Sequence, residues 1–169
     1  MARHTGPLLV DTNVIIESWR VSAWKALSSG YVVETVAECF AETQTGAQRR
    51  RPAEQIDHIL LGQTIKSVHP VSDEERAGLL VREPEAAFLD EGERMLWAHA
   101  WTRADAWVLC GPDKASLRIG IRLGLRDRLV SLDRLLGDVG FRPKLDLRLP
   151  YTQKWLDQAL AELAQREGK

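Results

Sequence analysis

Four acidic residues stand where a strand of the sequence passes into a helix, or within the first turns of a helix: Asp11, Glu38, Glu93 and Asp113. Side chains at such junctions gather beyond the carboxyl ends of neighbouring parallel strands. Unpaired carboxylates crowded into one cleft repel each other and shift each other's pKa values, and a divalent cation removes that conflict. Carboxylates, waters and phosphate oxygens are the ligands that suit Mg²⁺ and Mn²⁺. The pattern therefore predicts metal-assisted hydrolysis of a phosphodiester by an activated water.

The four positions differ in how strongly the local sequence indicates a site. Asp11 ends an apolar strand, where a carboxylate gains nothing from core packing, so a functional role is favoured over a turn role. Glu38 lies at the start of a helix, where the helix dipole favours a carboxylate in any case, and Glu34 is its alternative. Asp113 follows a Gly-Pro turn and also fits a helix N-cap.

The third acid has competitors in its own segment. Asp90 and Glu91 suit the same helix N-terminus as Glu93, and we rank Glu93 first and Asp90 second. Two polar residues follow the first acid in the sequence, Thr12 and Asn13. They either hold metal-bound waters or cap the following helix. We find no Ser-His-Asp or Cys-His arrangement that offers a competing nucleophile, and no Cys/His cluster typical of zinc.

The hydropathy pattern indicates the elements that must position these acids. Short apolar runs predict buried strands over residues 7–10, 31–33 and 107–110, with a further strand over 65–71. Helical spacing and capping residues predict a second set of segments as helices: 14–20, 22–28, 36–43 with Thr35 as N-cap, 53–62, a helix opened by a Ser72–Glu75 capping box, one opened by Asp90 or Glu91, 113–123, 131–136 and 152–165.

Strands that alternate with helices indicate parallel pairing through right-handed crossovers. We therefore expect an α/β fold with a doubly wound parallel sheet flanked by helices. The chain of 169 residues is long enough for one domain with a proper core, and two domains would be cramped. The predicted domain spans residues 1–169, with a core over 7–142 and a C-terminal helical extension over 150–166.

The charge balance limits how the chain could bind nucleic acid. The formal net charge is −1, whereas a protein that holds RNA by bulk charge is usually basic. Binding would need local basic strips beside the acidic site. Lys114, Arg118 and Arg122 recur at four-residue spacing along one helix face, which predicts a phosphate track. A further basic group lies in a predicted loop: Arg49, Arg50 and Arg51.

The sequence also bears on the compartment. No apolar run is long enough to span a bilayer, and the first residues do not resemble a secretory signal. Cys39 and Cys110 are too few for a disulfide framework and are expected to be reduced and buried. A cytoplasmic protein is therefore the expectation.

The segments around the four acids resemble the PIN-domain family. Residues 8–16 resemble the family's first strand with its Asp-Thr-Asn or Asp-Thr-Ser hallmark. Residues 36–40 resemble the second acidic motif, 89–93 a Gly-Glu variant of the third, and 109–114 the fourth. The likeness runs in order from about residue 8 to residue 140. Four motifs in order are considerably more specific than the short first motif alone.

The resemblance implies a doubly wound parallel sheet, dependence on Mg²⁺ or Mn²⁺, and cleavage of RNA. Many short bacterial members of the family are VapC toxins, which implies a small antitoxin as partner and a homodimer as one option. The chain departs from the family in three places, one of which is a tail beyond Pro143 that is longer than a minimal toxin needs. Met95 stands where many relatives have an acid, and Cys110-Gly111-Pro112 stands where relatives often have polar residues.

Two other functions stay open at this point. The Met95 departure is compatible with a catalytically incomplete PIN-like module that binds RNA or protein. An aspartate-nucleophile phosphatase is a third hypothesis, but Asn13 speaks against it because that class needs a second Asp two residues after its nucleophile. The sequence contains no glycine-rich Walker or dinucleotide-binding loop, so nucleotide hydrolysis and Rossmann redox chemistry rank last.

Overall fold

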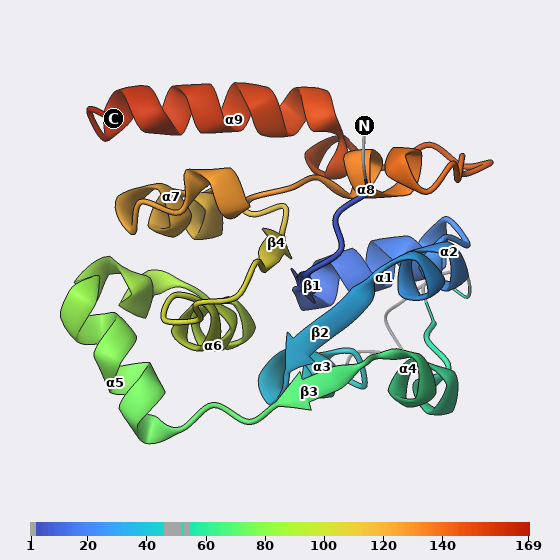
Figure 1. Cartoon of the computed structure of the whole chain (residues 1–169), viewed down its shortest axis with the longest axis horizontal. Helices are drawn as coiled ribbons and strands as arrows, with labels where there is room; N and C mark the ends of the chain where they lie inside the picture. The colour runs from blue at the N-terminus through green and yellow to red at the C-terminus, as the bar shows by residue number, and fades with distance from the viewer. Residues whose placement is uncertain (1–2, 46–51, 53–54) are drawn as a thin grey trace.

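The computed structural model describes residues 3–45, 52 and 55–169, and Figure 1 shows their arrangement. Four strands form one all-parallel sheet in the order β3-β2-β1-β4. They are β1 (Pro7–Val10), β2 (Val32–Val36), β3 (Ser67–His69) and β4 (Val108–Cys110). Because β1 pairs with both β2 and β4, the strands that precede Asp11, Glu38 and Asp113 are neighbours.

The register aligns the carboxyl ends of β1 and its neighbour β4, which lies at the edge of the sheet. Val10 of β1 lies opposite Cys110 of β4, and the amide of Asp11 donates to the Cys110 carbonyl at 3.3 Å. The chain therefore leaves both strands at the same level of the sheet. Asp11 and the loop that leads to Asp113 consequently start from one edge.

Helices connect the strands and continue beyond them. The α-helices are α1 (Thr12–Arg20), α2 (Trp24–Gly30), α3 (Ala37–Glu42), α4 (His58–Thr64), α5 (Asp73–Arg82), α6 (Glu91–Ala100), α7 (Lys114–Arg122), α8 (Leu132–Asp138) and α9 (Gln153–Arg166). Short 3-10 helices are η3 (Pro84–Phe88), η4 (Arg126–Arg128) and η5 (Leu149–Tyr151).

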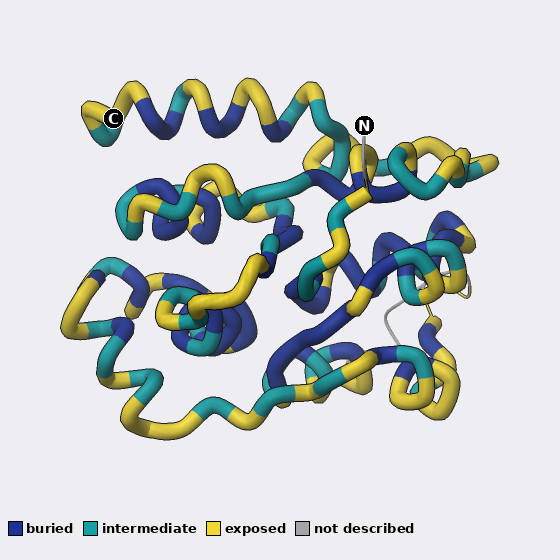
Figure 2. The backbone as a smooth tube through the Cα atoms, viewed as in Figure 1, coloured by how far each residue is buried: buried dark blue, intermediate teal, exposed yellow. Residues whose placement is uncertain are grey.

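Apolar side chains pack on both faces of the sheet. Leu8 of β1 belongs to a cluster with Ile15 of α1 and Leu27 of α2. Leu9, the next residue, belongs to a second cluster with Trp97 of α6. Successive strand residues point to opposite faces, so helices cover both sides of the sheet. Figure 2 shows β1 and most of β2 and β4 buried between these helical layers, whereas β3 at the edge of the sheet is partly exposed. β1 and β4 are accordingly continuous apolar runs, as in other two-sided parallel sheets, whereas β2 contains Glu34 and Thr35.

Two predicted boundaries, the end of β2 and the extent of β3, are wrong. β2 continues to Val36, which lies opposite His69, so Thr35 belongs to the strand and is not the predicted N-cap. The Thr35 hydroxyl instead donates to the Val10 carbonyl at 2.7 Å. The strand predicted over 65–71 is confined to the three residues of β3. Pairing with a distant segment thus decided the end of β2, not local capping propensity.

One other start signal is confirmed, and one predicted helix start is wrong. Ser72 and Glu75 form the predicted capping box at α5. The helix predicted over 53–62 is α4, which begins at His58 because the Asp57 carboxylate accepts from the amides of Ile59 and Leu60 at 3.0 Å each. The terminal helix predicted over 152–165 is α9, shifted by one residue.

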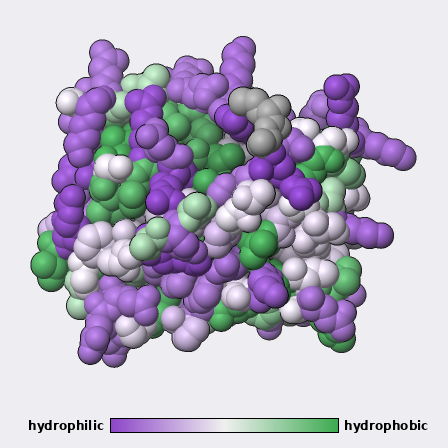
Figure 3. Space-filling view, viewed as in Figure 1, coloured by the Kyte–Doolittle hydropathy of each residue, from purple (hydrophilic) through white to green (hydrophobic). Residues whose placement is uncertain are grey.

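The terminal helix packs on the rest of the chain. Leu156, Leu160 and Leu163 of α9 form a buried cluster with Leu117 and Ile121 of α7. Figure 2 shows the buried side of α9 turned toward α7, and Figure 3 shows hydrophobic side chains along the seam between the two helices. Among the described residues, no helix is both long and apolar enough to cross a membrane.

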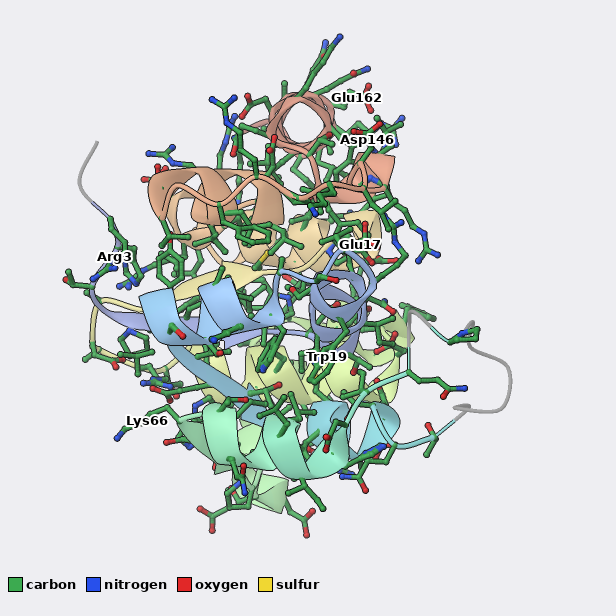
Figure 4. All side chains as sticks on the ribbon, turned by 90° about the vertical axis from the view of Figure 1, so that its right-hand side faces the viewer. Arg3, Glu17, Trp19, Lys66, Asp146 and Glu162 are labelled. Atoms are coloured by element: carbon green, nitrogen blue, oxygen red, sulfur yellow. The ribbon has the colours of Figure 1, made fainter. Side chains whose placement is uncertain are left out.

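A buried ion pair ties α1 to the segment before η5. Glu17 is fully buried, and Arg20 donates to its two carboxylate oxygens at 2.6 and 2.9 Å. The amide of Arg148 donates to the same carboxylate at 2.7 Å, and Arg20 also donates to the Asp146 carbonyl at 2.8 Å. Figure 4 labels Glu17 and Asp146 on this side of the molecule. The carboxylate therefore links α1 to a segment about 130 residues away.

We expect Glu17→Ala to lower the free energy of unfolding by about 3 kcal/mol, the usual cost of removing one partner of a buried ion pair. Urea denaturation measures this loss. Glu74→Ala, at an exposed position in the first turn of α5, is the matched control and should change stability by less than about 0.5 kcal/mol. Equal effects of the two variants would contradict a structural role for Glu17.

Candidate functional site

Asp11 forms the base of the candidate site. Its Oδ1 accepts from the Val14 amide at 2.9 Å, which makes it the N-cap of α1, and the residue is only 4% exposed. Burial raises its pKa to about 7, and the charges of Asp90 and Glu42 add to the shift. Gly111 lies beside the carboxylate, where an added Cβ would be in ordinary van der Waals contact at 3.5 Å from Asp11 Oδ2.

Glu93 is the centre of the acidic cluster. It is 6% exposed, and burial raises its pKa to about 9. Four further acids raise that pKa through their charges: Asp113, Asp90, Asp11 and Glu42. Glu93 thus interacts with acids from three other parts of the chain. The structure brings Asp11, Glu93 and Asp113 together, with Asp90 as a fourth predicted candidate.

The packing of α6 on α7 sets the N-termini of these helices side by side. The Trp97 indole donates to the Ser116 hydroxyl at 2.9 Å, and both groups are buried. The ring also lies against Gly120, where a Cβ would come within 2.9 Å of it. Such close contact needs glycine at this point. It fixes Glu93, at the start of α6, near Asp113, the N-cap of α7.

Two exposed acids lie at the rim of the cluster, and both are helix caps. Asp90 Oδ1 accepts from the Glu93 amide at 2.9 Å. Asp113 Oδ1 accepts from the amides of Ala115 at 2.7 Å and Ser116 at 3.3 Å. The capping role that competed with a functional role is therefore real at both positions. Capping alone does not explain why the capped ends meet around a buried glutamate.

Glu42 belongs to the cluster and was not predicted from the sequence. The Thr12 hydroxyl donates to Glu42 Oε2 at 2.6 Å. Its carboxylate also lies against the backbone of Gly92, where a Cβ would stand 2.8 Å from either oxygen. The signal available in the sequence was its position one helical turn after Glu38, on the same face of the helix. Thr12, a secondary candidate, thus positions an acid.

Glu38, one of the four predicted acids, is less clearly part of the cluster. It is partly exposed, and its buried Oε2 has no hydrogen-bond partner among the described residues. The charge of Glu42, not that of Glu38, is among the main charges acting on Asp11 and Glu93. The role of Glu38 as a metal ligand stays a prediction. The alternative Glu34 is engaged elsewhere, by Arg103 at 3.0 Å and by His69.

Tyr151 is a second residue that sequence reasoning missed. Its hydroxyl donates to the carbonyl of Asn13 at 3.3 Å, while Asn13 itself is exposed. Burial and the nearby charge of Asp11 raise the pKa of the Tyr151 phenol, so the phenol stays protonated beside the cluster. It comes from η5, in the predicted extension, and no local motif marks it.

The predicted basic strip on α7 is engaged by carboxylates. Lys114 pairs with Glu162 of α9 at 3.2 Å. Arg118 contacts two acids, Glu85 and Glu167, and Arg122 contacts Glu83 and Glu167 at 2.9 Å each. The loop arginines Arg49, Arg50 and Arg51 lie outside the described residues. Spacing alone predicted the strip, but its ion-pair partners come from distant segments.

The acids of the cluster offer carboxylate oxygens as donor atoms. Within residues 3–45, 52 and 55–169, no three side chains of His, Cys, Asp or Glu are grouped closely enough to enclose a metal ion. The acids therefore form an open cluster. Carboxylate oxygens with remaining positions for water and phosphate suit Mg²⁺ and Mn²⁺. The charges that most raise the pKa values of Asp11 and Glu93 are acidic, and a cation would relieve that repulsion.

Comparison with known proteins gives no assignment for this chain. No protein-family model matches the sequence, and no curated protein matches it. The structure establishes a parallel α/β sheet flanked by helices and an acidic cluster at one of its edges. The PIN-like identity stays a prediction from the four sequence motifs.

Proposed function

We propose that the chain is a metal-dependent endoribonuclease with a PIN-like fold, and that it hydrolyses RNA phosphodiester bonds. The observation that carries the proposal is the pair of buried acids, Asp11 and Glu93, with three further acids acting on them. Buried carboxyls with strongly raised pKa values cluster at functional sites. The edge where they meet lies beyond the carboxyl ends of parallel strands, where ligands bind in open α/β sheets.

Asp11, Glu93 and Glu42 would hold Mg²⁺ or Mn²⁺, with Asp90 and Asp113 at the rim. A bound cation supplies a more acidic water and shields the charge that grows on the phosphodiester. Thr12 holds the Glu42 carboxylate in place at 2.6 Å. The buried floor at Asp11 and Glu93 excludes water, which strengthens the electrostatic interactions made there.

The test is cleavage of a mixed-sequence RNA by the purified protein in Mg²⁺, in Mn²⁺ and in EDTA. We expect cleavage in either cation and none in EDTA, with activity restored when the cation is returned. Cleavage that persists in EDTA contradicts the proposal. So does intact RNA in both cations from protein whose thermal melting is cooperative.

We expect Gly92→Ala to lower the cleavage rate by about 10- to 100-fold, as changes beside metal ligands do. The added Cβ would stand 2.8 Å from the Glu42 oxygens and must displace that carboxylate. Gly78→Ala, in α5 with open space around it, is the matched helix-glycine control. If both variants keep the wild-type rate in Mn²⁺, Glu42 takes no part in the reaction.

A second candidate is a catalytically incomplete PIN-like module that binds RNA or protein. The open cluster, in which no three potential ligands are pre-assembled among the described residues, favours it. Isothermal titration with Mn²⁺ separates the two candidates. RNA binding without any Mn²⁺ binding favours the module, whereas Mn²⁺ binding that Asp11→Asn removes favours the enzyme. A small antitoxin and a homodimer stay predictions from the family resemblance.

A further inference from the structure

A groove of about 350 Å³ opens beside the acidic cluster, between η3, α7 and α9. Two of its lining residues are the chain neighbours of rim acids: Leu89 precedes Asp90, and Lys114 follows Asp113. The groove and the cluster therefore adjoin each other at the N-termini of α6 and α7. We expect a polymer bound at the acids to extend toward this groove.

The groove combines an apolar floor with an exposed aromatic ring. Leu89, Ile119 and Leu163 line the floor and are at most 6% exposed. Phe88, the last residue of η3, lines the groove and is 88% exposed. A phenylalanine with nearly its whole surface in water contributes little to folding. Its ring is available to an incoming flat, apolar group.

Cations also line the groove. Lys114 and Arg166 belong to its wall, together with Glu85, whose carboxylate pairs with Arg118, and Arg166 is exposed. The Lys114–Glu162 pair is half exposed on both sides, so it is weak and a phosphate can compete for the lysine. Arg118, also in the wall, is bound by Glu85 and Glu167 and is not assigned to the ligand. A flat apolar platform next to lysine and arginine matches a nucleotide.

The geometry points to a nucleotide subsite in this groove, where Phe88 stacks on one base of single-stranded RNA and Lys114 and Arg166 contact its phosphates. The inference rests on the proposed function and names the part of the substrate that the site would grip. Single-stranded RNA is bound by stacking of unpaired bases on aromatic side chains. The subsite would set which nucleotide lies beside the bond to be cut.

The test measures binding of a labelled RNA hexanucleotide by fluorescence anisotropy in EDTA, so that no metal-dependent cleavage occurs. We expect Phe88→Ala to weaken binding about tenfold or more, the loss that removal of one base–aromatic stack brings. Phe88→Trp should keep the affinity. Val81→Ala, which removes another exposed apolar side chain on α5 outside the groove wall, is the matched control and should leave affinity unchanged.

A set of hexanucleotides, each lacking one base, isolates stacking from phosphate contacts. We expect one missing base to weaken wild-type binding as much as Phe88→Ala does, and to have no further effect in that variant. Affinity unchanged in Phe88→Ala overturns the inference. So does an equal loss for every abasic probe, or a wild-type protein that binds no RNA.

The outcomes also separate this inference from the nuclease proposal. If RNA is cleaved in a metal-dependent way and Phe88→Ala does not change RNA binding, the subsite inference is wrong and the nuclease proposal stands. If RNA binding depends on Phe88 and on one base, but no divalent cation supports cleavage, the nuclease proposal is wrong and the subsite inference stands. A peptide partner in the groove would leave RNA affinity unchanged in Phe88→Ala and thus counts against the inference.

Discussion

Asp11→Asn is expected to lower the rate of RNA cleavage in Mn²⁺ by about 10³-fold or more. A catalytic cation supplies several kilocalories per mole of transition-state stabilisation, and each 1.36 kcal/mol is a factor of ten. Asparagine keeps the shape of the side chain and can still accept from the Val14 amide, so the cap of α1 is retained. What disappears is one carboxylate charge at the floor of the site.

The same substitution should raise stability when no metal is present. The buried Asp11 carboxylate is repelled by Asp90 and Glu42, and the neutral amide is not. Thermal melting at about pH 8 in EDTA should therefore give a higher Tm for Asp11→Asn than for the wild type. Gain of stability with loss of activity is typical of a site whose charges serve function.

Asp57→Asn is the matched control for this experiment. Asp57 is also an N-cap, of α4, but it is exposed and lies outside the acidic cluster. Its replacement should change neither the cleavage rate nor the metal-free Tm appreciably. An Asp11→Asn variant that cleaves RNA within threefold of the wild type would remove Asp11 from the mechanism.

The parts of the site that the sequence could predict are those marked by the hydropathy and capping pattern of neighbouring residues. Asp11 ends an apolar strand, and Asp113 begins a helix after a turn, so each could be placed at the sheet edge from a few neighbouring residues. The parallel sheet itself followed from apolar runs separated by helices. The strand, turn and helix signals behind these predictions each span fewer than about ten residues, the range in which hydropathy and capping rules apply.

The parts that could not be predicted depend on how distant elements pack. Glu42 enters the cluster because α3 meets the start of α6 at Gly92, 50 positions further along the chain. Tyr151 reaches Asn13 across 138 positions. Likewise, Thr35 pairs with β3 and belongs to β2, although the local sequence predicted it as a helix N-cap. None of these contacts has a signature in the spacing of nearby residues.

Metal-free protein should lose stability as the pH rises, and the cation should reverse the loss. The folded-state pKa values of Asp11 and Glu93, about 7 and about 9, lie above the ordinary values of 3.8 and 4.5. Between these limits the folded state binds more protons than the unfolded state, so the free energy of unfolding falls with rising pH. The loss begins near the ordinary pKa and is complete above about pH 7 for Asp11 and about pH 9 for Glu93.

The effect is large because both groups are almost fully buried. Each unit of pKa difference corresponds to 1.36 kcal/mol, so either carboxyl alone is worth up to about 4 kcal/mol near pH 8. For a chain of this length that is a fall in Tm of roughly 10 °C. Saturating Mg²⁺ should restore most of the lost stability. The gain in Tm should be larger at higher pH, because the ligands must be deprotonated to bind the cation.

Thermal melting from about pH 5 to about pH 8.5, in EDTA and in Mg²⁺, measures both slopes. Glu93→Gln should flatten the metal-free slope. Glu91→Gln, in the same turn of α6 but with its side chain 62% exposed, should leave it unchanged. Carboxylates that served only as helix caps would be stabilised in their ionised form by the helix dipole. Metal-free stability would then rise with pH, so the sign of the slope distinguishes a functional cluster from a set of caps.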